Sequence, residues 1–100
     1  MITLINLTSA TIALDYARWG PVPKVAELQA ANIYIYADDH NPPHFNVRGP
    51  DSDANFYIHN GEKYVGEVTR KAMREVADWW LVPENRKLLE NKWKEYNERD

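Results

Sequence analysis

Two aspartates and two histidines lie within the seven residues of Asp38–His44, which read Asp-Asp-His-Asn-Pro-Pro-His. An imidazole titrates near neutral pH and can move a proton, while a carboxylate can orient the imidazole or stabilise its charge. Both groups are also ligands for zinc, nickel and ferrous iron. The candidate catalytic residues are therefore Asp39, His40 and His44.

The spacing of the two histidines leaves three hypotheses open. His40 and His44 are four residues apart, as in helical metal sites, but Pro42 and Pro43 exclude a helix here. An extended segment also puts positions four apart on one side, so metal-free acid–base chemistry and a metal site both remain conceivable. The third hypothesis is structural, because such side chains at a proline corner often only bond the backbone. We assign no metal ligands and no cofactor.

Alternating apolar and polar side chains predict strands on both sides of this corner and a third strand beyond it. The predicted strands cover residues 32–37, 44–48 and 55–59, with 49–53 as a loop. Their core face would carry Ile33, Ile35, Phe45, Val47, Phe56 and Ile58. The opposite face is rich in aromatic and hydrogen-bonding groups, which indicates a binding or assembly surface. This exposed face would carry Tyr34, Tyr36, His44, Asn46, Arg48, Tyr57, His59 and Tyr64.

The dipeptide Asn60-Gly61 predicts a tight hairpin turn. A two-residue type I′ turn needs positive φ at both positions, and Asn-Gly supplies it. This turn would pair Phe56 with Val65 and place Val65 in the core.

Two helices are predicted after the hairpin. Thr69 is a candidate N-cap, and Met73, Val76, Ala77 and Trp80 recur at the spacing of a core-facing stripe. Pro83 ends or kinks this helix and suits the first turn of the next. The apolar stripe of that second helix would be Leu89, Trp93 and Tyr96.

These elements predict an α+β domain at residues 21–100, in which a small antiparallel sheet of three to four strands packs against one or two C-terminal helices. The stiff segment Gly20-Pro21-Val22-Pro23 separates residues 1–20, which we interpret as an N-terminal appendage or arm.

Three cations, Arg70, Lys71 and Arg74, cluster at the predicted start of the first helix, where the helix dipole disfavours positive charge. They make sense if an anion binds there, and they could also be ordinary exposed charges. The candidate binding residues are thus Tyr36, Asn46, Arg48, Tyr57, His59, Arg70, Lys71 and Arg74.

Composition limits the classes of protein that remain. The chain has 100 residues, 44% of them hydrophobic, which suits one globular domain with a modest core. It has no cysteine, so disulfides and thiolate metal sites are excluded. The net charge of −3 excludes global attraction to nucleic acid and leaves only a local basic patch for RNA. The apolar start is too short and too polar for a membrane span or signal peptide, so we expect a cytoplasmic protein that is not membrane-bound.

The run Asp39-His40-Asn41-Pro42-Pro43-His44-Phe45, after an Ile-Tyr-Ile-Tyr strand, resembles the motif of a bacterial family catalogued as domain of unknown function 4160. The resemblance extends over residues 23–93 and includes the basic helix start and the Trp-bearing end. This chain departs from the family pattern at Asn46, where a histidine is usual, which weakens a three-histidine metal site most. The resemblance implies a component of a small bacterial gene pair, with a toxin–antitoxin role suspected for some relatives.

Three functions are therefore expected, in order of preference. The first is an interaction module in a two-gene regulatory or toxin–antitoxin-type pair, with a protein partner or a second copy of the chain. The second is a metal-independent ribonuclease or phosphodiesterase that uses His40 and His44 as acid and base. The third is a metal-binding domain.

Overall fold

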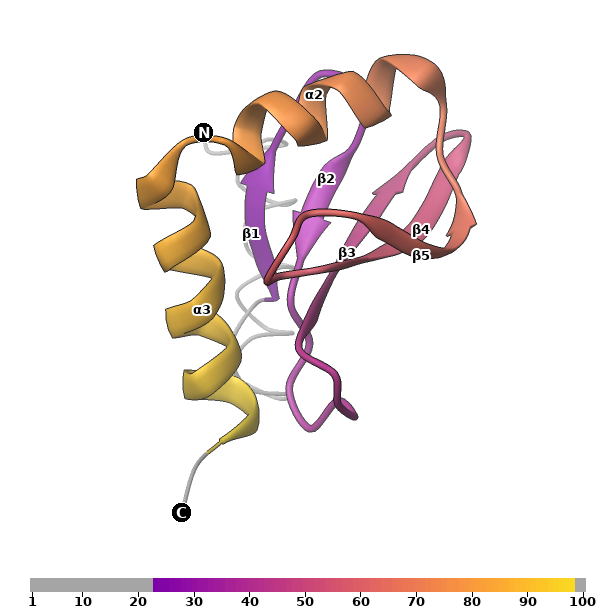
Figure 1. Ribbon diagram of the computed structural model, residues 1–100. Coiled ribbons are helices and arrows are strands. Elements are labelled where there is room, and N and C mark those ends of the chain that lie inside the picture. Colours follow the sequence, from indigo (N-terminus) through magenta and orange to yellow (C-terminus); the bar gives the residue numbers. More distant parts are fainter. Residues whose placement is uncertain (1–22, 99–100) are drawn as a thin grey trace, which may run out of the picture.

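A five-stranded antiparallel sheet and two helices make up residues 23–98, the part of the chain that this computed structural model describes (Figure 1). Strands that are consecutive in sequence are neighbours in the sheet, in the order β1-β2-β3-β4-β5. The elements are β1 (Lys24–Glu27), β2 (Asn32–Tyr34), β3 (His44–Gly49), β4 (Ser52–Tyr57), β5 (Lys63–Glu67), α2 (Arg70–Trp80) and α3 (Pro83–Asn97).

The predicted α+β class is confirmed, but the sheet has five strands and not three or four. The additional strand is β1, which pairs with β2 through Glu27 and Asn32. The proposed appendage at residues 1–20 lies outside the described residues. Neither helix within residues 23–98 is long and apolar enough to cross a membrane.

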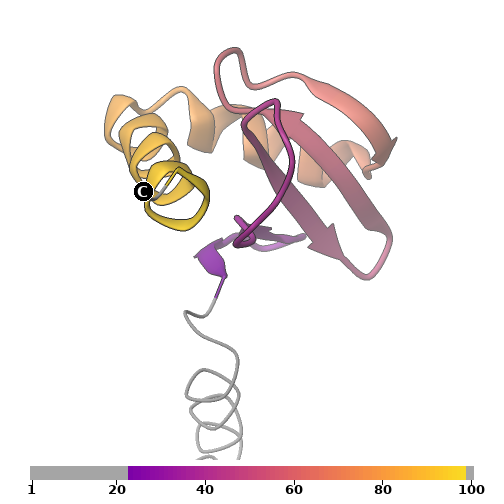
Figure 2. The same cartoon turned by 90° about the horizontal axis from the view of Figure 1, so that it is seen from below.

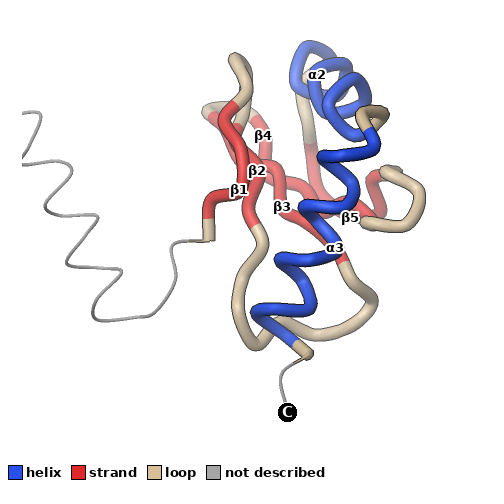
Figure 3. The backbone as a smooth tube through the Cα atoms, turned by 90° about the vertical axis from the view of Figure 1, so that its left-hand side faces the viewer, coloured by secondary structure: helices blue, strands red, loops and turns tan. Residues whose placement is uncertain are grey.

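The core lies between the curved sheet and the two helices. Seen from below, the sheet bends from β1 and β2 toward β5, and α3 lies across the open side of the bend (Figure 2). The helices α2 and α3 come after the five strands in sequence, and the side view shows them as a separate layer beside the sheet (Figure 3). Phe45 and Phe56 stack with ring centroids 5.4 Å apart, and both are fully buried, as are Val76 and Leu89 from the helices. Each such side chain contributes about 1.5–3 kcal/mol through burial.

The two hairpins differ from the predicted ones. Gly49 pairs with Ser52, so the predicted loop at 49–53 shrinks to a two-residue turn. The Asn60-Gly61 turn is wider than predicted, because β4 ends at Tyr57 and only Gly61 has a positive φ, of 73°. The Gly61 N–H donates to the Tyr57 carbonyl at 2.9 Å.

This wider turn changes the register of β5. A β-bulge between Asn55 and Phe56 pairs Val65 with Asn55 rather than with Phe56. The predicted core position of Val65 is therefore wrong, and the residue is 51% exposed.

Thr69 caps α2 as predicted, since its hydroxyl accepts a hydrogen bond from the Ala72 N–H at 3.1 Å. The buried stripe of α2 is Ala72 and Val76, while Met73 and Ala77 are exposed, contrary to prediction. The helix is fixed in this rotation by Trp80, whose indole N–H donates to the Ile58 carbonyl at 3.0 Å.

The second helix, α3, matches its prediction closely. Pro83 lies in its first turn, and Leu89, Trp93 and Tyr96 form its buried stripe. This stripe brings the last turns of α3 against the Asp38–His44 corner.

Candidate functional site

The last turn of α3 holds the corner between β2 and β3 in place. The Asp39 backbone N–H donates to Asn97 Oδ1 at 2.6 Å, and Asn97 Nδ2 donates to the Tyr36 carbonyl at 3.0 Å. The Asp38 N–H, in a residue with φ of 57°, reaches the Tyr96 carbonyl at 3.4 Å. The chain thus leaves β2 at Tyr34, earlier than predicted, because Tyr36 bonds to α3 instead of to a strand.

His44 lies buried at the base of this corner, with 2% of its side chain exposed. Its Nε2 lies 3.0 Å from Asp39 Oδ2, and its Nδ1 lies 2.8 Å from the Pro42 carbonyl. Both neighbours are hydrogen-bond acceptors when Asp39 is ionised, so both contacts need a proton on each ring nitrogen. Both ring nitrogens of His44 are therefore engaged by groups of the corner itself.

His40 binds the other oxygen of the same carboxylate. Its Nδ1 lies 3.1 Å from Asp39 Oδ1, and its backbone N–H donates to that oxygen at 2.9 Å. The His40 side chain is 79% exposed, so its Nε2 is open to solvent. The three candidate catalytic residues therefore lie together, with Asp39 between an exposed and a buried imidazole.

Aromatic rings close over His44. The Trp93 ring centroid lies 5.3 Å from that of His44, and the Tyr64 ring stands edge-on to it at 5.9 Å. His44 and Asn46 are both buried, so their predicted place on an exposed face is wrong. The alternating pattern of β3 could not reveal this, because α3 and β5 supply the cover from distant parts of the chain.

Two polar atoms near His44 are buried without a hydrogen-bond partner among the described residues. They are the Oδ1 of Asn46, two residues along the strand, and the Nε1 of Trp93. Each of these groups loses its bond to water on folding and gains none in return. This neighbourhood is thus polar and incompletely satisfied, unlike the apolar core beside it.

One group of predicted binding residues remains accessible around Tyr36. The rings of Tyr34 and Tyr36 are parallel to within 2°, with centroids 5.9 Å apart. The Arg48 guanidinium lies 5.5 Å from the Tyr36 ring centroid, and its Nε is 3.5 Å from Asp53. Burial raises the pKa of Tyr36, although the Arg48 charge partly opposes this, so the phenol is neutral and able to donate a hydrogen bond.

A second aromatic group lies on β4, β5 and the loop between them. Tyr57 and Tyr64 stack with centroids 4.5 Å apart, and the exposed His59 ring lies 5.2 Å from Tyr57. These rings present flat, amphipathic surfaces with few torsions to freeze on binding. Among the candidate binding residues of the sheet, Tyr36, Arg48, Tyr57 and His59 are thus exposed or half-buried, whereas Asn46 is buried.

The basic cluster at the start of α2 lies at the other end of the sheet. In the sheet, Asp53 pairs with Arg48 of β3 and with Glu67 of β5, and α2 begins at Arg70, three residues after Glu67. The start of α2 therefore follows the end of the sheet that holds Arg48, whereas His44 lies at the opposite end of β3. Four residues of strand separate His44 from Arg48, which is about 13 Å. Figure 1 shows the start of α2 at one end of the fold and the corner at the opposite end. The exposed cations Arg70, Lys71 and Arg74 thus form a separate surface from the histidines.

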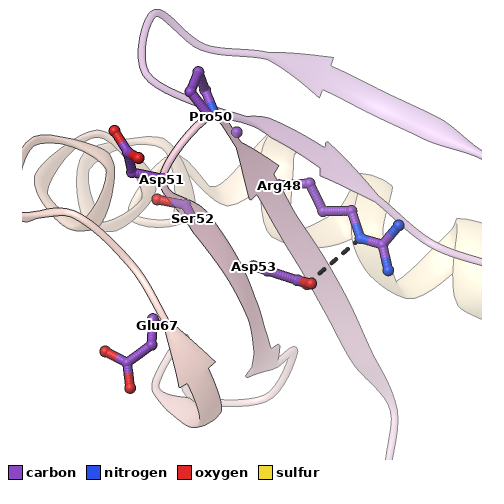
Figure 4. A pocket seen from close by; sticks show the side chains of 7 residues that line it. Arg48, Pro50, Asp51, Ser52, Asp53 and Glu67 are labelled. Carbon is purple, nitrogen blue, oxygen red and sulfur yellow. Dashed lines mark ion pairs between the residues drawn. The ribbon is translucent and has the colours of Figure 1, made fainter.

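A shallow hollow lies beside the turn at the far end of β3, close to the ion pair of Arg48 and Asp53 (Figure 4). The carboxylates of Asp51 and Glu67 stand on its rim. Its charges are exposed, and Ser52 Oγ is already engaged by the Thr69 N–H at 3.1 Å. The hollow holds no group from the histidine corner.

No group of three His, Asp or Glu side chains within residues 23–98 is arranged to hold a metal ion. The Asp39 carboxylate and the His44 ring use their facing atoms to bind each other. In the corner, Asp39, His40, His44 and the Pro42 carbonyl form one hydrogen-bond network.

The fold and the corner define a small α+β domain in which a proline-rich loop with two histidines is fastened to a C-terminal helix. A comparison with known families matches residues 31–94 to the family described as Domain of unknown function (DUF4160), and the chain belongs to it. The matched region extends from Ala31, the residue before β2, to Lys94, the residue after Trp93. No curated protein and no solved structure gives a significant match.

Proposed function

We propose that this protein is an interaction module that binds a partner protein, as one half of a bacterial two-gene regulatory or toxin–antitoxin-type pair in the cytoplasm. The observation that supports it is the burial of His44, with both ring nitrogens bound within the fold. These contacts support a structural role for His44 in the corner. A partner would therefore bind the accessible side of the sheet and not the buried ring of His44.

The partner would bind the tyrosine face, which we define by the side chains Tyr34, Tyr36, Arg48, Tyr57 and Tyr64. Tyrosine and arginine are enriched in the energetically important centres of protein interfaces. The stacked pairs Tyr34–Tyr36 and Tyr57–Tyr64 are already ordered, so binding would freeze few rotamers. The open His40 ring stands on the corner and could add a polar contact.

Co-expression with the product of the adjacent gene tests this proposal. We expect the two proteins to co-purify, and Tyr36→Ala and Arg48→Ala each to weaken the complex about tenfold or more, which is about 1.4 kcal/mol. Lys87→Ala, an exposed residue on α3 away from the sheet, is the matched control and should leave affinity unchanged. A complex that tolerates both sheet variants would assign the interface elsewhere, and absence of any complex would count against the proposal.

The alternative is a metal-independent ribonuclease or phosphodiesterase, and one contact favours it. Asp39 orients the exposed imidazole of His40 and leaves its Nε2 open to accept or donate a proton. His44 could act only through Asp39, and the cations of α2 are too distant to stabilise a phosphate at His40. In this case expression should arrest growth, and His40→Ala should relieve the arrest; a His40→Ala protein as toxic as its parent would exclude the alternative.

A further inference from the structure

The outer side of α2 carries a narrow apolar stripe between charged side chains, and this stripe is exposed in the described part of the chain. Met73, Ala77 and Leu81 recur every four residues, so they form one stripe along the helix surface, which we call the outer stripe. Met73 is 37% exposed and Leu81 64%. Figure 1 shows α2 on the outside of the fold. Of the four large apolar side chains exposed in the described residues, three lie on α2 or directly after it.

The charges of α2 are reversed with respect to its dipole. Its first turn has no acidic residue and carries Arg70 and Lys71, and its last turn has no basic residue. Positive charge is unfavourable at a helix N-terminus and favourable at a C-terminus. No ion pair within residues 23–98 neutralises Arg70 or Arg74, although Asp78 is four residues from Arg74.

An antiparallel copy of the same helix would satisfy both features. We propose that two copies of this chain associate through α2, packed antiparallel about a two-fold axis at Ala77. Met73 and Leu81 each lie four residues from Ala77, on opposite sides of it. Met73 of one copy would therefore face Leu81 of the second copy across the interface. Arg70 would then lie near the C-terminal end of the partner's helix, where a cation is stabilising.

The size of the surface sets the expected affinity. A helix of 11 residues is about 16 Å long, so it covers much less than the roughly 800 Å² per partner of a standard interface. Small Ala77 at the crossing point allows close approach of the two helices. We therefore expect a weak, concentration-dependent dimer with a dissociation constant in the micromolar range or above. This proposal does not depend on the tyrosine face.

Sedimentation velocity of the full chain, from about 1 µM to about 500 µM, tests the association. We expect the mean sedimentation coefficient to rise toward that of a dimer, and Leu81→Glu to raise the dissociation constant tenfold or more. Leu81 is exposed, so this variant should fold, as far-UV circular dichroism can verify. Val65→Glu is the matched control, because Val65 is similarly exposed but lies on β5, and it should leave the dimer unchanged.

Cysteine cross-linking tests the orientation, because the chain has no native cysteine. Ala77→Cys lies on the proposed axis and should form an intermolecular disulfide on mild oxidation. Met73→Cys is the control: the two copies would lie about 12 Å apart along the axes, beyond the reach of a disulfide. A chain that stays monomeric throughout, as it would if another part of the same chain or RNA occupied this surface, would overturn the proposal. So would a dimer that Leu81→Glu leaves intact or that cross-links at Met73→Cys alone.

Discussion

The Asp39 carboxylate serves two imidazoles at once, and the two differ in exposure. His40 is in solvent, where a hydrogen bond to a carboxylate contributes little because water competes for it. His44 is buried, so its two ring nitrogens depend on Asp39 and the Pro42 carbonyl and have no access to water in their place. The stability of the corner should therefore depend on the second histidine of the motif far more than on the first.

Replacing His44 tests this at the scale of one residue. We expect His44→Phe to lower the free energy of unfolding by about 2–4 kcal/mol, because it keeps a ring but leaves Asp39 and Pro42 unpaired. His40→Ala should change it by less than about 0.5 kcal/mol. Urea denaturation measures both, and equal effects of the two variants would contradict the assignment of the structural role to His44.

At the scale of an element, the packing of the hairpin between β4 and β5 on α2 depends on a single glycine. Gly61 has a φ of 73°, and a Cβ there would lie 2.7 Å from the ring of Trp80. The loop can thus pack directly on α2 only because this position has no side chain. The hydrogen bond from Trp80 to Ile58 completes the contact between hairpin and helix.

Gly61→Ala should therefore destabilise the fold by about 1–3 kcal/mol, through the strained φ and the overlap with the indole. The neighbouring His59→Ala, on the exposed side of the same loop, is the control and should be nearly neutral. Thermal unfolding followed by tryptophan fluorescence would report the loss of contact at Trp80. An unchanged melting temperature for Gly61→Ala would show that the loop can move away from the helix at no cost.

Most elements of this fold could be predicted from the sequence, since strand alternation, the Thr69 cap and the Leu89–Trp93–Tyr96 stripe are local patterns. The hairpin register could not, because Asn60-Gly61 suits several turn lengths and a bulge decides between them. The predicted rotation of α2 was also wrong. The stripe of Ala72 and Val76 lies next to that of Met73 and Ala77 on the helix surface, so the sequence pattern does not distinguish them. Only contacts with the hairpin decide which stripe is buried.

At the scale of the molecule, the corner and α3 form one unit although they are far apart in sequence. Asn97 bonds to Asp39 and Tyr36 across separations of 58 and 61 residues. The spacing of Asp39, His40 and His44 allowed them to lie on one side of an extended segment, and it left open whether they do. The partners Asn97 and Trp93 could not, because nothing local to the corner indicates which helix covers it. The cations of α2 share no site with the histidines, because the length of β3 separates the two groups.

Asn97→Ala should loosen this unit without unfolding it. We expect a loss of about 1–2 kcal/mol from two hydrogen bonds, concentrated at the corner. Hydrogen exchange at the Asp39 amide, which donates to Asn97, should accelerate about tenfold or more, while β3 and β4 amides keep their protection. Asn91→Ala, exposed on the same helix, is the control. Uniform acceleration across the sheet would show instead that Asn97 stabilises the whole domain.

The long separation between Asp39 and Asn97 also sets an order of events during synthesis. At about 5–20 residues per second, a ribosome adds Asn97 roughly 3–12 s after Asp39, 58 residues later. The hairpins of β2 to β5 can pair as they leave the exit tunnel, because their partners are close in sequence. The histidine corner cannot close until the helix that fastens it has emerged. During that interval the imidazole of His44 is open to solvent in the nascent chain, and it becomes enclosed only when α3 docks.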